Sequence, residues 1–169
     1  MQSDFQKLRV GQGYGSHRLV EGRDFILGGL KIEHDKGLDG HSDADVLLHA
    51  VIDSVLGATG QGDIGRWFPD TDPEHKDACS KELLNKVWAS CQKEGWTLVN
   101  VDCVVCLEKP KLVSHIEAIE RNIAELLNGK HSQVNVKATT GEKMGFVGRG
   151  EGVFSSVTIL LYNESLKTD

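Results

Sequence analysis

The alternation of apolar and polar positions predicts five strands and three helices. Runs rich in Val, Ile and Leu are bounded by Gly, Pro, Asn or charged residues, as strands are, and they cover residues 8–14, 25–32, 99–107, 134–140 and 153–162. Apolar residues recur every three or four positions in residues 45–56, 80–94 and 112–127, which is typical of helices with one buried stripe. The order β-β-α-α-β-α-β-β predicts an α/β (α+β) domain of two layers, with three helices on one face of a mixed sheet of about five strands.

Length and composition place these elements in one globular unit. We expect residues 1–169 to form a single domain, with residues 1–7 as a disordered N-terminal extension. The longest apolar runs, such as residues 158–162, are far below the roughly 18 residues that a spanning helix needs. The N-terminal residues resemble neither a secretory signal nor a transit peptide, so we expect a bacterial cytoplasmic protein or a mature chain of the plastid stroma.

The net charge of -6 argues against nucleic acid as a partner, because such binding rests on neutralising phosphates. A phosphorylated ligand must therefore meet local positive charge, backbone N–H groups or metal ions. Cys103 and Cys106 form a C-x-x-C motif, but residues three apart on a strand face opposite sides. We interpret them as packing residues; a redox or zinc-ribbon module is the alternative.

A glycine-rich segment at residues 11–18 follows the first predicted strand. Dinucleotide-binding turns open a helix, whereas the sequence after this segment, RLVEGRDFILGG, has no helical stripe. We expect a tight turn that brings backbone close to a ligand and presents His17. A surface turn with an exposed histidine is the alternative.

A second polar segment opens the first predicted helix. A start near Ser42 or Asp43, both favoured cap residues, puts three polar side chains one turn apart on one face, namely Asp45, His49 and Asp53. This pattern fits a metal-binding histidine supported by carboxylates or a plain solvated face. His41 precedes the helix, where backbone N–H groups attract anions such as phosphate.

Two further segments are rich in groups that could contact a ligand. Residues 139–152 contain five glycines, two hydroxyls and the cations Lys143 and Arg149, which suit phosphate oxygens, and Glu142 is the kind of ligand that Mg²⁺ takes; a flexible hairpin connection is the alternative. Residues 62–73 are irregular, and their carboxylates suit polyol hydroxyls or turn capping: Asp63, Asp70 and Asp72.

Four motifs in this order resemble the 2-C-methyl-D-erythritol 2,4-cyclodiphosphate synthases of the non-mevalonate isoprenoid pathway. They are RVGQGYGSHRL, GLDGHSDADVLLHAVIDSVLGATGQGDIGRWFPDTDP, VNVDCVVCLEKPKL and VNVKATTGEKMGFVGRGEG. The resemblance implies a lyase that acts on 4-diphosphocytidyl-2-C-methyl-D-erythritol 2-phosphate, a cytidine diphosphate compound. It also implies a homotrimer with active sites between subunits, and no nucleic-acid or membrane partner.

The resemblance also implies roles for individual residues. A Zn²⁺ ion would be held by His17 and His49, and Mg²⁺ or Mn²⁺ by Glu142, while His41 and Thr140 would stabilise the transition state. The contacts to the methylerythritol and phosphate groups would be Gly15, Ser16, His17, His41, Ser42, Asp63, Ile64, Gly65, Phe68, Pro69, Asp70, Thr71 and Asp72. The cytidine pocket would be Leu107, Glu108, Lys109, Pro110, Lys111, Leu112 and Val113, completed by Thr139, Thr140, Gly141, Glu142, Phe146 and Arg149.

One position departs from the family pattern. The family has an aspartate two residues before the first histidine, as a third zinc ligand, and this sequence has Gly15. Two imidazoles remain where catalytic zinc usually has three protein ligands, so we expect weaker metal binding. Water, substrate oxygens or Asp45 could fill the gap. The alternative function is a metal-impaired homologue that binds a cytidine nucleotide or an isoprenoid phosphate without turnover.

Overall fold

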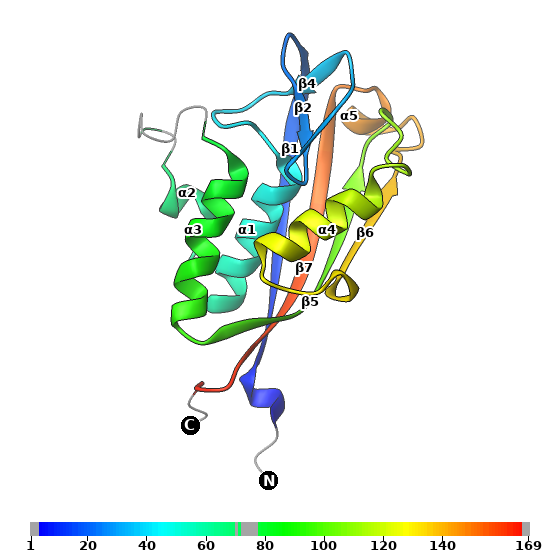
Figure 1. Cartoon of the computed structure of the whole chain (residues 1–169). Coiled ribbons are helices and arrows are strands. Elements are labelled where there is room, and N and C mark those ends of the chain that lie inside the picture. Colours follow the sequence, from blue (N-terminus) through cyan, green and yellow to red (C-terminus); the bar gives the residue numbers. More distant parts are fainter. Residues whose placement is uncertain (1–3, 70, 72–77, 167–169) are drawn as a thin grey trace.

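A computed structural model describes residues 4–69, 71 and 78–166. Its main sheet has the strand order β4-β1-β7-β5-β6, and the three long helices lie on one face of it (Figure 1). The strands of this sheet are β1 (Leu8–Glu21), β4 (Lys36–Leu38), β5 (Trp96–Cys106), β6 (Val134–Thr139) and β7 (Gly152–Asn163). The helices are α1 (Val46–Thr59), α2 (Ile64–Trp67), α3 (Ser80–Lys93), α4 (Ile116–Leu126) and α5 (Gly145–Gly148). The predicted two-layer α+β class is confirmed.

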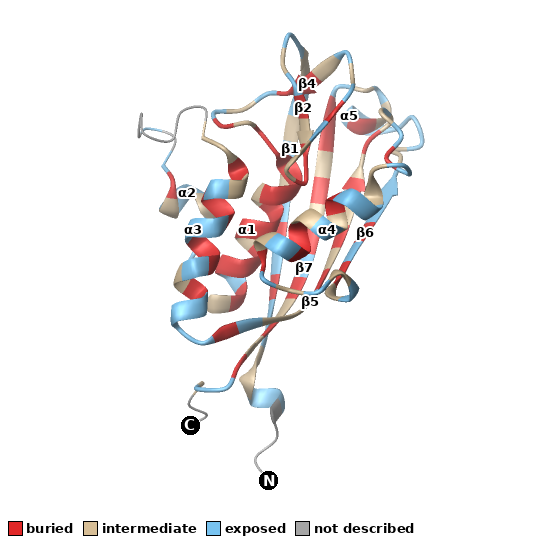
Figure 2. Cartoon of the chain, in the orientation of Figure 1, coloured by how far each residue is buried: buried red, intermediate tan, exposed pale blue. Residues whose placement is uncertain are grey.

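Strands β1 and β7 form the long antiparallel centre of the sheet, paired from Leu8↔Tyr162 to Arg18↔Gly152. Strand β5 runs antiparallel to β7 and parallel to β6. Alternate residues of β7, such as Val157 and Ile159, are fully buried under the helices. Buried positions, red in Figure 2, lie along β7 and on the helices in front of it. No helix covers the other face in the described part of the chain (Figure 1), where Tyr14 is 62% exposed.

The glycine-rich segment is part of a strand, so the expected turn after residue 14 is wrong. Strand β1 continues to Glu21 and pairs with β7 through the whole segment. A Cβ atom on Gly11 would lie 1.8 Å from the Ser54 carbonyl oxygen, and one on Gly13 would lie 1.8 Å from that of Ala50. These glycines therefore allow the backbone of β1 to lie directly against the backbone of α1.

The second predicted strand folds as a separate hairpin. Strands β2 (Phe25–Leu27) and β3 (Leu30–Ile32) pair with each other and not with the main sheet. Gly28 and Gly29 form the turn with positive φ angles of 60° and 78°. Strand β4 pairs with β1 at the edge of the main sheet instead. Its three residues are too few to show an alternation of apolar and polar positions in the sequence.

Helix α1 begins after Asp45 rather than near Ser42 or Asp43. The Asp45 carboxylate accepts hydrogen bonds from the N–H groups of Leu47 and Leu48, and so caps the helix. Helix α3 begins at Ser80 as predicted. Helix α4 begins four residues later than expected, because residues 112–115 form a turn closed by the N–H of His115 on the carbonyl of Leu112.

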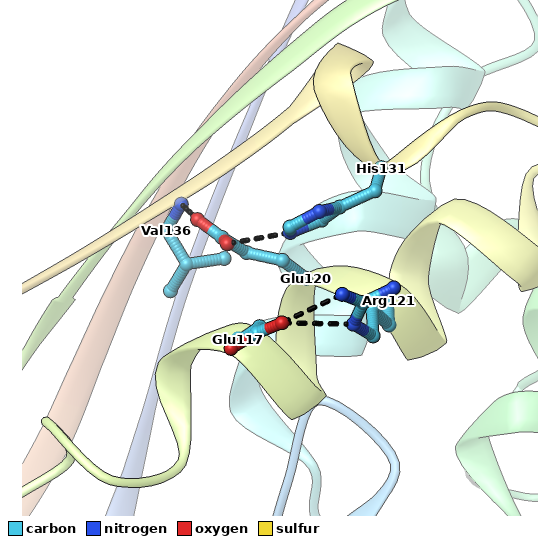
Figure 3. A network of polar contacts seen from close by, with 5 residues as sticks. All are labelled: Glu117, Glu120, Arg121, His131 and Val136. Atoms are coloured by element: carbon cyan, nitrogen blue, oxygen red, sulfur yellow. Dashed lines mark hydrogen bonds and ion pairs between the residues drawn. The ribbon is translucent and has the colours of Figure 1, made fainter.

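Helix α4 covers the exposed edge of strand β6. Glu120 on α4 accepts a hydrogen bond from the backbone N–H of Val136 at 2.9 Å and contacts His131 Nε2 at 3.0 Å (Figure 3). On the solvent side of the same helix, Arg121 pairs with Glu117. Edge strands present unpaired N–H groups, so Glu120 satisfies one of them.

Two smaller expectations have different outcomes. Residues Asp4–Lys7 form a 3₁₀ helix where disorder was expected, and Lys7 pairs with Glu164 at 2.8 Å, which holds this turn to the end of β7; residues 1–3 lie outside the described part. Cys103 is buried and Cys106 is partly exposed, both as free thiols, so the prediction of opposite faces is confirmed. Within the described ranges, no helix is long and apolar enough to cross a bilayer.

Candidate functional site

A cavity of about 380 Å³ lies where β1 passes the N-terminal end of α1. It brings together ten of the residues singled out from the sequence, namely Gly15, Ser16, His17, His41, Ser42, His49, Asp53, Ile64, Gly65 and Phe68. Its remaining wall is formed by Tyr14, Gly40 and Leu83. His17 of strand β1 and His49 of helix α1 therefore share one site.

The two imidazoles face each other through their inner nitrogens. His17 Nε2 lies 3.2 Å from His49 Nδ1. The outer nitrogen of His17, Nδ1, lies 2.8 Å from the carbonyl oxygen of Asp39. A carbonyl can only accept, so Nδ1 carries the proton and Nε2 of neutral His17 presents a lone pair. Burial lowers the pKa of His17, against the hydrogen bond to Asp39, and this favours the neutral ring.

The outer nitrogen of His49 contacts two hydroxyl groups. Nε2 lies 3.1 Å from Ser42 Oγ and 2.9 Å from Ser80 Oγ. A metal-binding histidine ordinarily has such a partner on its second nitrogen. Two nitrogens bound to one tetrahedral zinc at about 2.0–2.1 Å stand about 3.3 Å apart. The His17–His49 pair therefore fits two positions around such a cation.

A third side-chain ligand is absent at the predicted position. Gly15 lies two residues before His17 on the same face of β1, and a Cβ atom there would lie 3.2 Å from Val46. Among the described residues, no three His, Cys, Asp or Glu side chains are grouped to hold a metal. Asp45 cannot supply the ligand, because it is fully buried and accepts four backbone hydrogen bonds, from Leu47, Leu48 and the two glycines of the β2–β3 turn.

The Asp45 carboxylate lies at the start of α1, where an anion such as phosphate was expected. Asp45 itself occupies the N–H groups of Leu47 and Leu48 in the first turn of the helix, so these two groups do not bind a phosphate. Burial raises the pKa of Asp45 to about 7, and its hydrogen bonds oppose that rise. His41 lies five residues before the helix, exposed on the cavity wall. A ligand in the cavity can therefore contact the His41 side chain without contacting the N–H groups at the start of α1.

The irregular segment 62–73 supplies the opposite side of the cavity through α2. Asp63 caps this helix by accepting from the N–H of Arg66 at 2.9 Å, which favours its capping role. Asp53 on α1 accepts from the N–H of Ile64 at 2.7 Å and so fixes α2 to α1. Phe68 is buried on the cavity wall, while Pro69 and Thr71 are exposed. Asp70 and Asp72 lie outside the described residues.

The remaining predicted residues lie in two loops that are joined to each other. The loop after β5 contains Glu108, whose carboxylate accepts from the N–H of Gly141 at 2.9 Å in the loop after β6. A cavity of about 450 Å³ here is lined by Glu108, Lys109, Lys143 and Arg149 among others. Leu107 and Leu112 point into the core, with exposures of 4% and 2%, so only their backbone can reach a ligand, whereas Val113 is exposed. Lys111 is also exposed.

Two of the predicted ligand-binding side chains in this region, those of Thr140 and Arg149, are bonded to glutamates. The Thr140 hydroxyl donates to Glu142 at 2.7 Å, and Thr139 before it is exposed at the end of β6. The Arg149 guanidinium contacts Glu151 through two nitrogens. Phe146 lies in a further cavity that also includes His17. Within the described part of one chain, Glu142 and Thr140 are not among the residues that line the histidine cavity.

Two residues of the site were not assigned from the sequence. Ser80 is fully buried at the start of α3 and contacts His49. Asp43 accepts from the backbone N–H of Ser80 at 3.0 Å and also from its hydroxyl. Both residue types are ordinary helix caps in sequence, and only the packing of α3 on α1 brings them to the histidine.

Comparison with known proteins places this site in a family. The model of the YgbB family matches residues 8–162, which is nearly the whole chain. The chain belongs to the YgbB family. It is 60% identical over 153 residues to the 2-C-methyl-D-erythritol 2,4-cyclodiphosphate synthase of Geobacillus kaustophilus, a match that covers 90% of this chain and 97% of that one. It is 56% identical to the synthase of Bacillus subtilis, with the same coverage.

Solved structures similar to this YgbB chain agree with the sequence comparison. The bifunctional IspDF of Campylobacter jejuni superposes with a TM-score of 0.89 at 41% identity, over 92% of this chain and 42% of that one. The IspF of Plasmodium falciparum, solved as a CDP complex, has a TM-score of 0.81 at 34% identity, over 94% and 97% of the two chains. The resemblance to cyclodiphosphate synthases expected from the four motifs is confirmed.

Proposed function

We propose that the protein is a cyclodiphosphate synthase that converts 4-diphosphocytidyl-2-C-methyl-D-erythritol 2-phosphate to 2-C-methyl-D-erythritol 2,4-cyclodiphosphate and CMP. The 2-phosphate of the substrate attacks its own β-phosphorus, a new phosphorus–oxygen bond closes the ring, and CMP leaves. The observation that carries the proposal is the facing pair His17 and His49 in a chain 60% identical to a named synthase. Bacterial relatives of this kind support a cytoplasmic location.

The reaction needs positioning and charge neutralisation more than a protein nucleophile, because the attacking group belongs to the substrate. His41 is exposed on the cavity wall beside Ser42 and can donate to a phosphate oxygen that gains charge. Thr140 would supply a second donor once a ligand replaces its bond to Glu142. The joined loops around Glu108 and Gly141 would hold the cytidine through backbone groups.

Divalent cations complete this assignment. His17 and His49 would hold one ion, of the zinc type, and Glu142 a second, Mg²⁺ or Mn²⁺. When bound, such ions neutralise the negative charge of the diphosphate and polarise its oxygens. The facing inner nitrogens of the two imidazoles, 3.2 Å apart, support the first site. At that site Gly15 contributes no ligand, so oxygens of water or substrate are expected in the third position.

A homotrimer with sites between subunits accounts for two observations. The candidate residues of one chain are divided between the histidine cavity and the cavity at the joined loops. The uncovered sheet face also exposes apolar side chains, with Val10 at 67% and Tyr14 at 62%. Light scattering on the purified protein should give three chains per particle. A monomer that turns over substrate would contradict this arrangement.

Measurement of CMP release tests the proposed activity directly. The purified protein is incubated with the cytidyl substrate and Mg²⁺ or Mn²⁺, with and without Zn²⁺. We expect CMP release that a chelator abolishes, that is lost in His49→Ala and that is kept in Ser54→Ala. The Ser54 hydroxyl donates to the Val51 carbonyl within its own helix. No CMP under any of these conditions would refute the activity.

Gly15 favours a second candidate function. A metal-impaired relative would bind a cytidine nucleotide or an isoprenoid phosphate and release no CMP. Calorimetric titration with CDP, which is bound in the Plasmodium falciparum structure, separates the two functions when it is combined with the CMP-release assay. Tight CDP binding without turnover would identify a binding protein.

A further inference from the structure

Ser80 is a buried serine whose hydroxyl lies between a carboxylate and a site histidine. It is the first residue of α3 and is fully buried. Its hydroxyl donates to Asp43 Oδ1, and its backbone N–H donates to Asp43 Oδ2 at 3.0 Å. The same hydroxyl oxygen lies 2.9 Å from His49 Nε2. Buried polar groups arranged in such a chain specify one arrangement of hydrogen bonds.

The direction of these bonds follows from counting protons. A serine hydroxyl has one proton, and Ser80 gives it to the Asp43 carboxylate, which can only accept. The contact between Ser80 Oγ and His49 Nε2 is therefore a hydrogen bond only if Nε2 carries a proton. Neutral His49 must then present the lone pair of Nδ1, the nitrogen that lies 3.2 Å from His17 Nε2.

The neighbouring Ser42 cannot impose this choice. Its oxygen accepts from the N–H of Ala44 at 3.1 Å, and its own proton remains available for other partners. At 3.1 Å from His49 Nε2, Ser42 could donate to the ring or accept from it. Ser80 differs because Asp43 takes its only proton. Among the contacts between described residues, the Asp43–Ser80 pair thus distinguishes the two tautomers of His49.

We propose that Ser80, held by Asp43, is a positioning residue that fixes the tautomer of His49 so that Nδ1 faces His17 with a free electron pair. Together with the Asp39 carbonyl, which fixes His17 in the opposite sense, it makes both inner nitrogens electron-pair donors at once. Two such nitrogens repel each other, and a cation bound between them removes this repulsion. The proposal rests on the cation site described above, but its first test uses the metal-free protein.

The test compares Ser80→Ala with a matched control, Ser54→Ala. Ser54 is also a fully buried helical serine, and its hydroxyl bonds to the Val51 carbonyl within α1. Nitrogen-15 NMR of metal-free protein, with histidine labelled and the His49 signals assigned from a His49→Gln variant, reports which ring nitrogen carries the proton. We expect protonated Nε2 in the unaltered protein and in Ser54→Ala, and a mixture of tautomers in Ser80→Ala.

Zinc affinity, measured against a competing chelator, is the second readout. Loss of a partner on the outer nitrogen typically weakens metal binding about 10- to 100-fold. We expect that loss in Ser80→Ala, recovery in Ser80→Thr, and no change in Ser54→Ala. If Ser80→Ala does not fold, the unaltered protein alone still decides, because protonated Nδ1 on His49 would overturn the proposal. Protonated Nε2 without zinc binding would instead refute the cation site and leave the tautomer assignment standing.

Discussion

Replacing Gly15 with aspartate should supply the ligand that the first cation site lacks. Gly15 has no positive φ angle, so a side chain there needs no unusual backbone conformation. Its Cβ atom would lie 3.2 Å from the Val46 carbonyl oxygen and from Val46 Cγ2, contacts that need a shift of a few tenths of an ångström. Small overpacking of this kind costs about 1–3 kcal/mol, and we expect the lower end for the metal-free protein.

The gain appears only when metal binds. Two unit charges about 4 Å apart at an effective dielectric constant of about 20 interact by about 4 kcal/mol, and a divalent ion doubles that value. Desolvation of the carboxylate removes several kcal/mol of it. We therefore expect zinc affinity to rise at least about tenfold, which corresponds to about 1.4 kcal/mol. Zinc should then raise the melting temperature of Gly15→Asp more than that of the unaltered protein.

The assay is zinc titration against a chelator, followed by CMP release at limiting zinc. Gln92→Glu is the control, because it adds the same charge without changing side-chain shape, on an exposed position at the far end of α3 from Ser80. Equal zinc affinity in Gly15→Asp and the control would show that position 15 does not face the cation. A tighter site with an unchanged rate of CMP release would show that this ion does not limit turnover.

Three further changes test the scaffold, each by urea unfolding at one protein concentration. Asp45→Asn places an amide group against one of the N–H donors that the carboxylate now accepts from, and we expect a loss of about 1–3 kcal/mol with unchanged zinc affinity; a large loss of affinity would revive Asp45 as a ligand. Gly13→Ala puts a methyl group 1.8 Å from the Ala50 carbonyl oxygen, so we expect a loss of about 3 kcal/mol or more, and a stable variant would contradict the backbone contact. Glu120→Ala should cost about 1–3 kcal/mol because it leaves an edge N–H unsatisfied, whereas Glu117→Ala on the exposed side should cost under about 1 kcal/mol, and equal effects would refute the role of Glu120.

Sequence patterns predict this fold where one physical requirement dominates. The buried stripe of α3 predicts its start at Ser80. The pairing of His17 with His49 was implied by the family resemblance and not by the residue pattern itself. The glycines of β1 led to the wrong prediction of a turn. Glycine is typical of turns, but it is also required where a strand packs directly against the backbone of a helix. The capping role of Asp45 was missed because Ser42 and Asp43 are equally good caps, and only the N–H groups of the distant β2–β3 turn select Asp45.

The separation of the two backbones that carry the imidazoles is set by main-chain contact. His17 belongs to β1 and His49 to α1, and the glycines of β1 let these two backbones touch without side chains between them. Rotamer changes and substitutions elsewhere in the core can therefore rearrange many side chains without altering the separation of these two backbones. The contact between the backbones of β1 and α1 therefore tolerates substitutions in the surrounding core, as long as Gly11 and Gly13 are retained.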